Sequence, residues 1–284
     1  MGSPLNFNMS SGCDGVQTVE IKCLLQGIYE YYGHDFRNYA AASIRRRIVH
    51  HMQTEGFESV SALMERVLRD RGSMERLLRG LTLHVTAMFR DPEFYLVFRR
   101  KVVPFLRTYP FTRLWVVGCS TGEEVYSLAI VMREEGLYDK CRIYATDLSD
   151  VVIQRASEGV FPLSAMKTYT ENYLKAGGTA EFSSYYTAKY ENAIFRSALR
   201  ENIVFAQHNL TSDGSFNEFN VIFCRNVMIY FNTTLQHQVC NLLHESLARF
   251  GILALGSRES LRFTPHEASY DVIDEQWRTY RRER

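Results

Sequence analysis

The sequence predicts an α/β protein, in which an all-helical N-terminal domain is followed by a domain built on a mostly parallel sheet. Two observations predict this fold class. Residues 18–80 show only the three- and four-residue apolar spacing of amphipathic helices. From residue 114 onward, short apolar runs alternate with helical patterns, as in strand–helix–strand units. We therefore expect one domain at residues 15–104 and a second at residues 105–284.

Polar residues mark the expected helix starts in the first half. Ser59 and Ser73 precede apolar-periodic segments, and a serine side chain accepts a hydrogen bond from the first helical turn. Asp91 followed by Pro92 predicts another helix start, because proline suits the first helical position. Arg90 then lies in the connection just before that helix, where a side chain can reach a cleft.

Three consecutive arginines, Arg45, Arg46 and Arg47, lie on the second expected helix. Consecutive residues point in different directions around a helix, but at least two of the three can share a solvent-facing stripe with His50. Two interpretations stay open: a solvated helix face, which composition alone favours, or a basic docking surface for an acidic helical partner.

The second half is expected to contain six strand regions and a small insertion. Residues 160–200 are too long for an ordinary connection, and we expect a small subdomain of short antiparallel strands there. Thr233 with Gln236 resembles a capping box for a helix that runs to Phe250. The expected strand regions are residues 114–117, 142–147, 202–207, 219–224 and 251–255, with a final antiparallel pair between 270 and 280.

Composition excludes several classes of protein. The formal net charge of +1 provides no overall field for nucleic acid. The six cysteines include no C-x-x-C pair, which argues against a metal centre and against a disulfide framework. No apolar run reaches membrane-spanning length and no signal-peptide pattern opens the chain. We expect a cytoplasmic monomer without membrane insertion or a nucleic-acid partner.

A glycine-containing loop follows the first expected strand, at the place where open α/β sheets bind nucleotide-like ligands. The loop runs from Gly118 to Gly122 and leads into a helix opened by Glu123 and Glu124. It lacks the third glycine of a dinucleotide fingerprint and the Gly-Lys-Ser/Thr of a phosphate-binding loop. The two glutamates suit the positive end of the helix dipole, but they also repel a phosphate and attract an amino or sulfonium group.

Asp147 ends the second expected strand, where a carboxylate is placed to accept hydrogen bonds from ribose hydroxyls. It is also placed to cap the next helix, although Ser149 is better positioned for that role. Together, the glycine loop, the helix-opening glutamates and Asp147 point to S-adenosylmethionine, which has a ribose, an amino acid and a positive sulfur but no phosphate.

Two further stretches follow expected strands. Asn209 has the groups to recognise an adenine edge, or it is simply a turn residue. Arg225 and Asn226 directly follow a buried strand on the binding side of the sheet, where such residues are more often functional than structural. Cys224 is a weaker candidate for a catalytic nucleophile, because no sequence signal links a histidine to it as a base.

Five segments of the chain stand out: T-A-M-F-R-D-P (86–92), G-C-S-T-G-E-E-V-Y-S (118–127), A-T-D-L (145–148), H-N-L (208–210) and I-F-C-R-N-V-M-I-Y-F (222–231). In this order they resemble the chemotaxis receptor methyltransferase (CheR) family. The resemblance implies a Rossmann-like class I methyltransferase domain with a small inserted β-subdomain. It also implies methyl transfer from S-adenosylmethionine to glutamate carboxylates in the cytoplasmic helical domain of a chemoreceptor or related signalling protein, with S-adenosylhomocysteine as the product.

The resemblance also assigns residues to roles. Arg90 and Tyr230 would be closest to the transferred methyl, and the arginine-rich helix (Arg45, Arg46, Arg47) would face the receptor. Two departures stand out: His84 replaces the family's usual Asn, and the insert around Gly177 and Gly178 has no match to the family's peptide-docking form. The implied cofactor-binding residues are His84, Thr86, Arg90, Gly118, Glu124, Asp147, Asn209, Leu210, Arg225 and Asn226.

Two other functions remain alternatives at this point. A methyltransferase of small carboxylic acids would need no helical domain with an arginine-rich helix. A non-catalytic S-adenosylmethionine-binding adaptor would have no reason to keep the residues implied in catalysis. Those residues are all present: Thr86, Arg90, Asp147, Asn226 and Tyr230.

Overall fold

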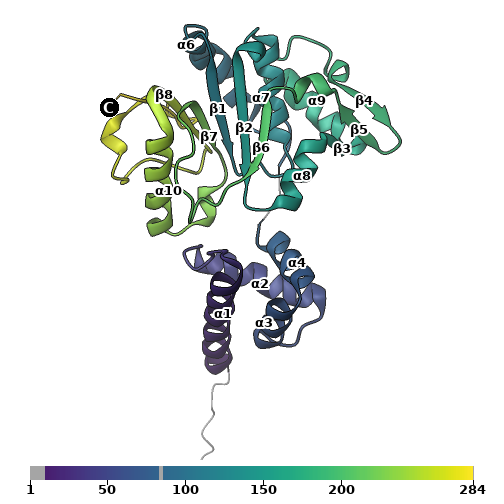
Figure 1. Ribbon diagram of the computed structural model, residues 1–284, viewed down its shortest axis with the longest axis vertical. Coiled ribbons are helices and arrows are strands. Elements are labelled where there is room, and N and C mark those ends of the chain that lie inside the picture. Colours follow the sequence, from purple (N-terminus) through teal and green to yellow (C-terminus); the bar gives the residue numbers. More distant parts are fainter. Residues whose placement is uncertain (1–9, 83–85, 284) are drawn as a thin grey trace, which may run out of the picture. The chain divides into compact units, whose positions relative to one another are not determined.

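The computed structural model describes residues 10–82 and 86–283, with side chains from residue 15 onward (Figure 1). Contacts divide the chain into two units. The helical unit comprises residues up to Leu83 together with Tyr230–Leu235, and the sheet unit comprises His84–Ile229 and Gln236–Arg284. Residues 86–104 pack within the sheet unit. The expected boundary between two domains at 104/105 stays a prediction.

The helical unit is built from four helices whose apolar faces meet. Helix α1 packs on α3, and α2 packs on α3 and α4, so Leu24, Ile48 and Leu77 are completely buried. Such apolar faces at three- and four-residue spacing account for the association of the helices. The helices are α1 (Ser10–Tyr32), α2 (Ala41–Glu55), α3 (Val60–Arg69) and α4 (Arg71–Leu81).

The two predicted serine caps of this unit have different outcomes. Ser59 caps α3 as expected, because its hydroxyl oxygen accepts the Ala62 N–H at 3.1 Å. The prediction for Ser73 is wrong. Asp70 caps α4 instead, accepting the Gly72 N–H at 3.0 Å, and Ser73 is buried in the first turn. A carboxylate three residues earlier therefore takes the role, which lengthens the helix at its N-terminus.

A short segment distant in sequence belongs to the helical unit. Residues Tyr230–Leu235 run beside the connection between α1 and α2. The Ala40 N–H donates to the Tyr230 carbonyl at 2.8 Å, and the Asn232 N–H donates to the Asn38 carbonyl at 2.9 Å. These bonds form a strand-like pairing, so the segment is a structural part of the helical unit.

The sheet unit contains a seven-stranded sheet in the order β6-β2-β1-β7-β8-β10-β9. The first five strands are parallel, whereas β10 pairs antiparallel with β8 and β9. The predicted alternation and the predicted final antiparallel pair are both confirmed. The strands are β1 (Thr112–Val117), β2 (Cys141–Asp147), β6 (Ile203–Gln207), β7 (Phe219–Cys224), β8 (Leu247–Leu255), β9 (Tyr270–Asp274) and β10 (Thr279–Arg282).

Helices cover the sheet, and α7 and α8 pack against β2. Helix α7 ends at Glu134, and Gly136 follows in the left-handed conformation at φ 68°, which glycine adopts readily after a helix. The helices are α5 (Pro92–Val97), α6 (Val103–Leu106), α7 (Glu123–Glu134), α8 (Asp150–Glu158), α9 (Met166–Lys175) and α10 (Thr233–Ser246), with a π-helical turn (Phe98–Val102) joining α5 and α6.

Two predictions for α10 are wrong. The helix ends at Ser246 rather than Phe250, because Leu247 already pairs with Phe219 as the first residue of β8. Thr233 is the first residue of the helix rather than its cap, so the predicted cap position lies one residue too late. Asn232, one residue earlier, accepts the Leu235 N–H at 2.9 Å with its side-chain oxygen.

The inserted segment forms the expected short antiparallel strands and also the helix α9. The strands β3 (Val160–Pro162), β4 (Tyr186–Lys189) and β5 (Asn192–Phe195) make a sheet in the order β3-β5-β4, which lies beyond α9 at the margin of the unit (Figure 1). Buried Glu134 of α7 ties the insert down, because it accepts hydrogen bonds from the Tyr185 hydroxyl at 3.0 Å and the Thr179 N–H at 3.1 Å.

Candidate active site

The carboxyl ends of four neighbouring parallel strands meet at one edge of the large sheet. Asn209 follows β6, Asp147 ends β2, Gly118 follows β1 and Arg225 follows β7. Strands β6, β2, β1 and β7 are adjacent and parallel, so the structure brings these predicted site residues to the same edge. This is the location at which open α/β sheets bind their ligands.

Two loops at this edge approach each other closely: the β1 loop (residues 118–122) and the β7 loop (residues 225–229). Gly118 has φ 63° and Gly122 has φ 99°, values that favour glycine. A Cβ atom on Gly118 would lie 2.8 Å from the Cγ2 atom of Val227, which is shorter than van der Waals contact. Gly118 is therefore required both for its backbone conformation and for the approach of the β7 loop.

The Asp147 carboxylate accepts hydrogen bonds from two backbone N–H groups at this edge of the sheet. Its Oδ2 atom accepts the Ser120 N–H at 2.9 Å, and its Oδ1 atom accepts the Ser149 N–H at 3.3 Å. A carboxylate has about four acceptor positions, so two remain for further donors. Ser149 occupies the N-cap position of α8, as predicted, but its side chain makes no capping hydrogen bond.

Buried Arg225 joins two partly exposed carboxylates in a group that we call the charge cluster: Asp91, Glu124 and Arg225. Its Nη1 atom donates to Glu124 Oε1 at 2.5 Å and its Nη2 atom to Asp91 Oδ2 at 2.8 Å. The Phe94 ring lies 4.0 Å from the guanidinium carbon. Burial acts to lower the pKa of Arg225, but the Glu124 carboxylate helps to raise it overall. With both acids ionised the cluster carries one excess negative charge, which suits a cationic ligand.

Arg90 lies directly before Asp91 on a backbone segment with two unusual residues. Phe89 and Asp91 have φ values of 52° and 55°, in the left-handed region that non-glycine residues seldom adopt. The Phe89 N–H donates to the Ser127 hydroxyl oxygen on α7 at 2.8 Å, and Asp91 pairs with Arg225. The half-buried Arg90 is therefore held between two fixed neighbours.

The prediction for the start of α5 is half correct. Pro92 is the first residue of the helix, as expected, but the Asp91 side chain makes no capping hydrogen bond. Its left-handed backbone points the carboxylate to Arg225 instead. Thr86 is half-buried ahead of this segment, and His84 lies outside the described residues.

Glu123 has a structural position at the start of α7. It is buried, and its carboxylate accepts hydrogen bonds from the Thr121 hydroxyl at 2.6 Å and the Tyr169 hydroxyl at 3.3 Å. Burial raises the pKa of Glu123. The two helix-opening glutamates thus differ: Glu124 joins the charge cluster, and Glu123 connects the β1 loop to α9.

Asn209 shapes its own turn after β6. Its side-chain oxygen accepts the Thr211 N–H at 3.0 Å and the Thr211 hydroxyl at 2.7 Å. The turn interpretation therefore holds for the oxygen, and the amide NH₂ is the part that is suited to donate to a ligand. Leu210 beside it is half-buried.

Tyr230 belongs to the helical unit, where it contacts Arg47. The Arg47 guanidinium lies 4.3 Å from the centre of the Tyr230 ring, and its Nη1 atom donates to the Leu81 carbonyl. Arg47 is only 6% exposed, so its predicted place on a docking surface is wrong. Successive helical positions point in different directions, and this one points into the unit.

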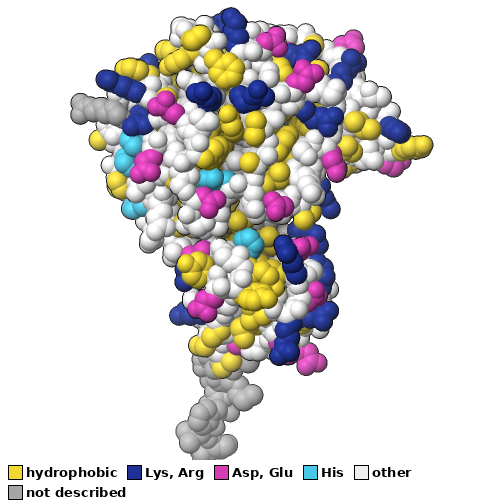
Figure 2. Space-filling model, viewed as in Figure 1, with side chains coloured by type: hydrophobic (Ala, Val, Ile, Leu, Met, Phe, Trp, Pro, Cys, Tyr) yellow, Lys and Arg dark blue, Asp and Glu magenta, His cyan; other side chains and the backbone are white. Residues whose placement is uncertain are grey.

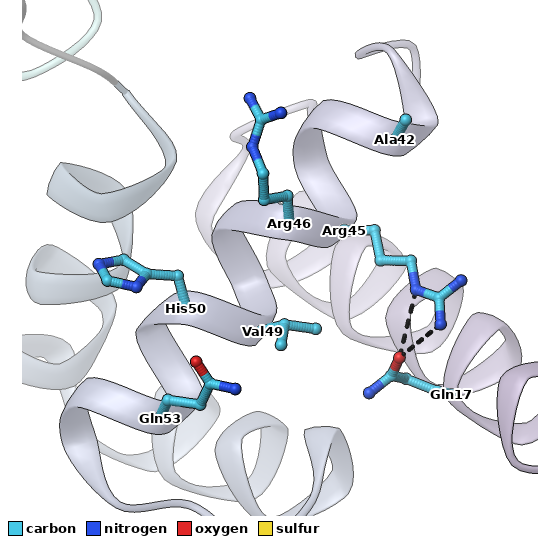
Figure 3. A pocket seen from close by; sticks show the side chains of 7 residues that line it. All are labelled: Gln17, Ala42, Arg45, Arg46, Val49, His50 and Gln53. Atoms are coloured by element: carbon cyan, nitrogen blue, oxygen red, sulfur yellow. Dashed lines mark hydrogen bonds between the residues drawn. The ribbon is translucent and has the colours of Figure 1, made fainter.

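The half-buried Arg45 and the exposed Arg46 of α2 line a hollow of about 610 Å³ (Figure 3). We call it the α2 surface. Arg45 extends toward α1 and donates to the Gln17 side-chain oxygen through Nε at 3.2 Å and Nη2 at 3.0 Å. Arg46 and His50 are exposed and extend to the other side of α2. The surface is formed by Gln17, Ala42, Arg45, Arg46, Val49, His50 and Gln53.

Four arginines of α3 and α4 are matched by acids. Figure 2 shows Lys and Arg side chains gathered on the side of this unit where α3 and α4 lie. Within the part of the chain that the structure describes, neither Arg46 of α2 nor Arg79 of α4 has an ion-pair partner, and both are exposed. The matched pairs are Arg66–Asp70 (3.3 Å), Arg69–Glu65 (3.5 Å), Arg71–Glu75 (3.8 Å) and Arg76–Glu55 (3.0 Å).

Sequence reasoning missed two residues of the site: Asp91 and Glu259. Asp91 was expected to be a helix cap, and its ion pair with Arg225 joins positions 134 residues apart. Glu259 was not singled out, although it follows the end of β8 at the same edge of the sheet. The rule that identified Arg225, a charged residue shortly after a buried strand, applies to Glu259 as well.

Family models match almost the whole chain. The model described as "CheR methyltransferase, SAM binding domain" matches residues 84–278, and the one described as "CheR methyltransferase, all-alpha domain" matches residues 20–82. The chain belongs to the CheR methyltransferase family. Its predicted fold class, an all-helical domain followed by a Rossmann-like methyltransferase domain, is thereby confirmed.

Curated relatives of this CheR methyltransferase extend over similar lengths. A Pseudomonas putida protein named "Putative methyltransferase Cher3" is 48% identical, over 93% of this chain and 97% of the relative. A chemotaxis protein methyltransferase of Listeria innocua is 29% identical, over 81% of this chain and 85% of the relative. A solved methyltransferase from Geobacter sulfurreducens, in complex with S-adenosyl-L-homocysteine, matches 61% of this chain and 50% of its own at 17% identity, with a TM-score of 0.34.

S-adenosylmethionine is the cofactor of this CheR methyltransferase, as the sequence predicted. The site residues fit it, because the charge cluster has an excess negative charge and Asp147 has acceptor positions left for hydroxyls. Across the described residues, no helix combines the length and the apolar character that a membrane span requires.

Proposed function

We propose that this CheR methyltransferase is a protein-glutamate O-methyltransferase. Its substrate would be the cytoplasmic helical domain of a chemoreceptor or a related signalling protein, in which it esterifies glutamate side chains. Two features together carry this proposal. The charge cluster suits a cationic cofactor, and the exposed Arg46 of the α2 surface suits an acidic partner. Relatives named as chemotaxis protein methyltransferases support the choice of partner.

The proposed cofactor contacts follow the geometry of the sheet edge. S-adenosylmethionine supplies an activated methyl group on a positively charged sulfur. Asp147 would accept the ribose hydroxyls, because two of its acceptor positions are not used by backbone N–H groups. Glu124 would accept the amino group. The other proposed contacts are Thr86, Arg90, Gly118, Arg225 and Asn226, the Asn209 NH₂ group with Leu210 at the adenine, and His84, which lies outside the described residues.

The chain needs no strong general base for this reaction. A glutamate side chain has an ordinary pKa of about 4.3, so the substrate is already ionised at neutral pH. The protein must therefore orient the carboxylate and exclude water. Arg90 is suited to orientation, because its planar guanidinium donates two parallel hydrogen bonds to a carboxylate. The Tyr230 hydroxyl would donate to one substrate oxygen and hold it in line.

The helical unit would select the partner. Glutamate-rich helices are attracted to the exposed, unpaired charge of Arg46, and the Arg45 side chain is directed by Gln17. Arg47 is buried and would act on Tyr230 rather than on the partner surface. A small carboxylic acid would gain nothing from this surface. The protein is proposed to act as a cytoplasmic monomer.

Methyl labelling tests the proposal directly. The full chain is incubated with methyl-labelled S-adenosylmethionine and the cytoplasmic fragments of the source organism's chemoreceptors. We expect base-labile label on at least one fragment, and loss of that label when the fragment's acceptor glutamates are replaced by alanine. S-adenosylhomocysteine binding without any ester would instead indicate an adaptor, and ester formed only on small acids would overturn the choice of a protein substrate.

A further inference from the structure

A buried carboxylate outside the proposed contacts lies at the same sheet edge. Glu259 is 5% exposed and follows the end of β8 by four residues. Because β8 runs parallel to β7 and beside it, the segment after β8 lies next to the β7 loop. No step of the proposed reaction uses Glu259.

Both oxygens of Glu259 are occupied by backbone N–H groups. Its Oε2 atom accepts from Gly256 at 2.6 Å and from Asn226 at 2.8 Å, while its Oε1 atom accepts from Val227 at 2.9 Å and from Met228 at 2.7 Å. These four bonds fill the acceptor positions of one carboxylate. Burial raises the pKa of Glu259, and the four donors act to lower it.

The contact fixes an otherwise unfavourable turn. Asn226 has φ 61°, and left-handed backbone at such a residue persists only when its surroundings hold it. Gly256 is needed for the approach, because a Cβ atom there would lie 2.6 Å from Glu259 Oε2 and 2.8 Å from the Asn226 nitrogen. Glu259 thus replaces the missing hydrogen-bond partners of three consecutive N–H groups.

The anchored turn also sets the distance to the β1 loop. Val227, held through its N–H by Glu259, is the residue whose side chain approaches Gly118. On one side of this turn, Arg225 enters the charge cluster. A displacement of the turn would therefore change both loops that face the cofactor.

We propose that Glu259 is a positioning residue of the cofactor pocket, whose carboxylate holds the β7 loop in the conformation that presents Arg225 and Asn226 to S-adenosylmethionine. The inference rests on the proposed roles of Arg225 and Asn226. A purely structural role would lower stability alone, whereas a positioning role must also lower cofactor affinity.

Glu259→Gln tests the proposal with almost no change of volume. The amide keeps one acceptor oxygen and turns an NH₂ group toward two of the four N–H donors. We expect the Kd for S-adenosylhomocysteine, measured by calorimetry, to rise about tenfold to hundredfold, or about 1.4–2.8 kcal/mol. Binding of this product needs no receptor, so the result does not depend on the choice of substrate.

Glu134→Gln is the matched control. Glu134 is a second buried carboxylate with several N–H and O–H donors, and it holds the insert rather than the cofactor loops. We expect a lower Tm for both variants and a raised Kd for Glu259→Gln alone. The proposal is overturned if Glu259→Gln lowers Tm and leaves the Kd within twofold of the unaltered protein.

A measurement on the unaltered, cofactor-free protein decides the case in which Glu259→Gln does not fold. Hydrogen exchange of the Val227 and Met228 amides is followed with time. A preformed anchor predicts exchange at least about 100-fold slower than in an unstructured peptide. Exchange at peptide rates would mean that the turn forms only with cofactor, and it would rule out Glu259 as the group that holds it ready.

Discussion

The charge cluster and the α2 surface both depend on arginine, but they use it in opposite ways. In the cluster, Arg225 is buried and bonded to two carboxylates, so its position is fixed before any ligand arrives. On the α2 surface, Arg46 is exposed and has no ion pair within the described chain. Buried, paired charge provides defined geometry, whereas exposed charge provides long-range attraction that salt weakens. The first suits a small cofactor and the second suits a large partner.

Arg90→Ala should have the largest effect, because it removes the proposed orienting group from the segment that carries Asp91. We expect methyl transfer to a receptor fragment to fall at least about 10³-fold, since alignment and charge placement supply the rate. Release of labelled methyl ester measures it. The control is Arg100→Ala at an exposed position, and this variant should keep the methyl-transfer activity. Near-normal turnover of Arg90→Ala would remove Arg90 from the chemistry.

Arg225→Met should lower the free energy of unfolding more than any single substitution on the α2 surface. It leaves the Asp91 and Glu124 carboxylates without their partner, and breaking a buried ion pair costs about 3–5 kcal/mol. Urea unfolding measures the loss. Arg107→Met, at a half-exposed pair with Glu135, should cost only about 0–1 kcal/mol. Equal losses for the two variants would show that burial does not distinguish these pairs.

Asp147→Ala should lower the affinity for the cofactor and have little effect on the affinity for the protein partner. Losing a charged acceptor of two hydroxyls should raise the Kd for S-adenosylhomocysteine about tenfold to several hundredfold. Calorimetry measures it, and Asp150→Ala, on the first turn of α8, should stay within twofold of the unaltered protein. An unchanged affinity of Asp147→Ala would contradict the proposed ribose contact.

Arg46→Glu should have the smallest effect, and that effect should depend on salt. We expect the KM for a receptor fragment to rise about threefold to tenfold at low ionic strength, and this difference to shrink near 0.5 M salt (about 4 Å screening length). The Kd for S-adenosylhomocysteine should not change. Arg69→Glu on α3, where the arginine is already paired with Glu65, is the control. A salt-independent loss would indicate damage to the fold.

Local sequence patterns predicted what is decided locally. The alternation of strands and helices, the Ser59 cap and the placement of Asp147 at a strand end depend on near neighbours, and the structure confirms them. The end of α10 could not be predicted from near neighbours, because the apolar residues after Ser246 fit a helix or a strand equally well. Pairing of Leu247 with Phe219 decides for the strand, and that partner lies 28 positions away.

The same limit applies to the site. Composition and position placed Glu124 and Arg225 in one pocket, and the structure joins them at 2.5 Å. No local signal showed that Asp91 would leave its capping role for Arg225, because the alternative partner is remote in sequence. The burial of Arg47 was likewise hidden, since a helix exposes only some of three consecutive residues.

The chain passes between its two units more than once, at residues 83/84, 229/230 and 235/236. The stretch from Tyr230 to Leu235 finds its backbone partners at Asn38 and Ala40. Cutting the chain before residue 84 would therefore strip these partners from a stretch that the remaining piece still carries. The helical unit is not a detachable module, and a catalytic fragment trimmed at that point would carry a segment without its backbone partners in the middle of its sequence.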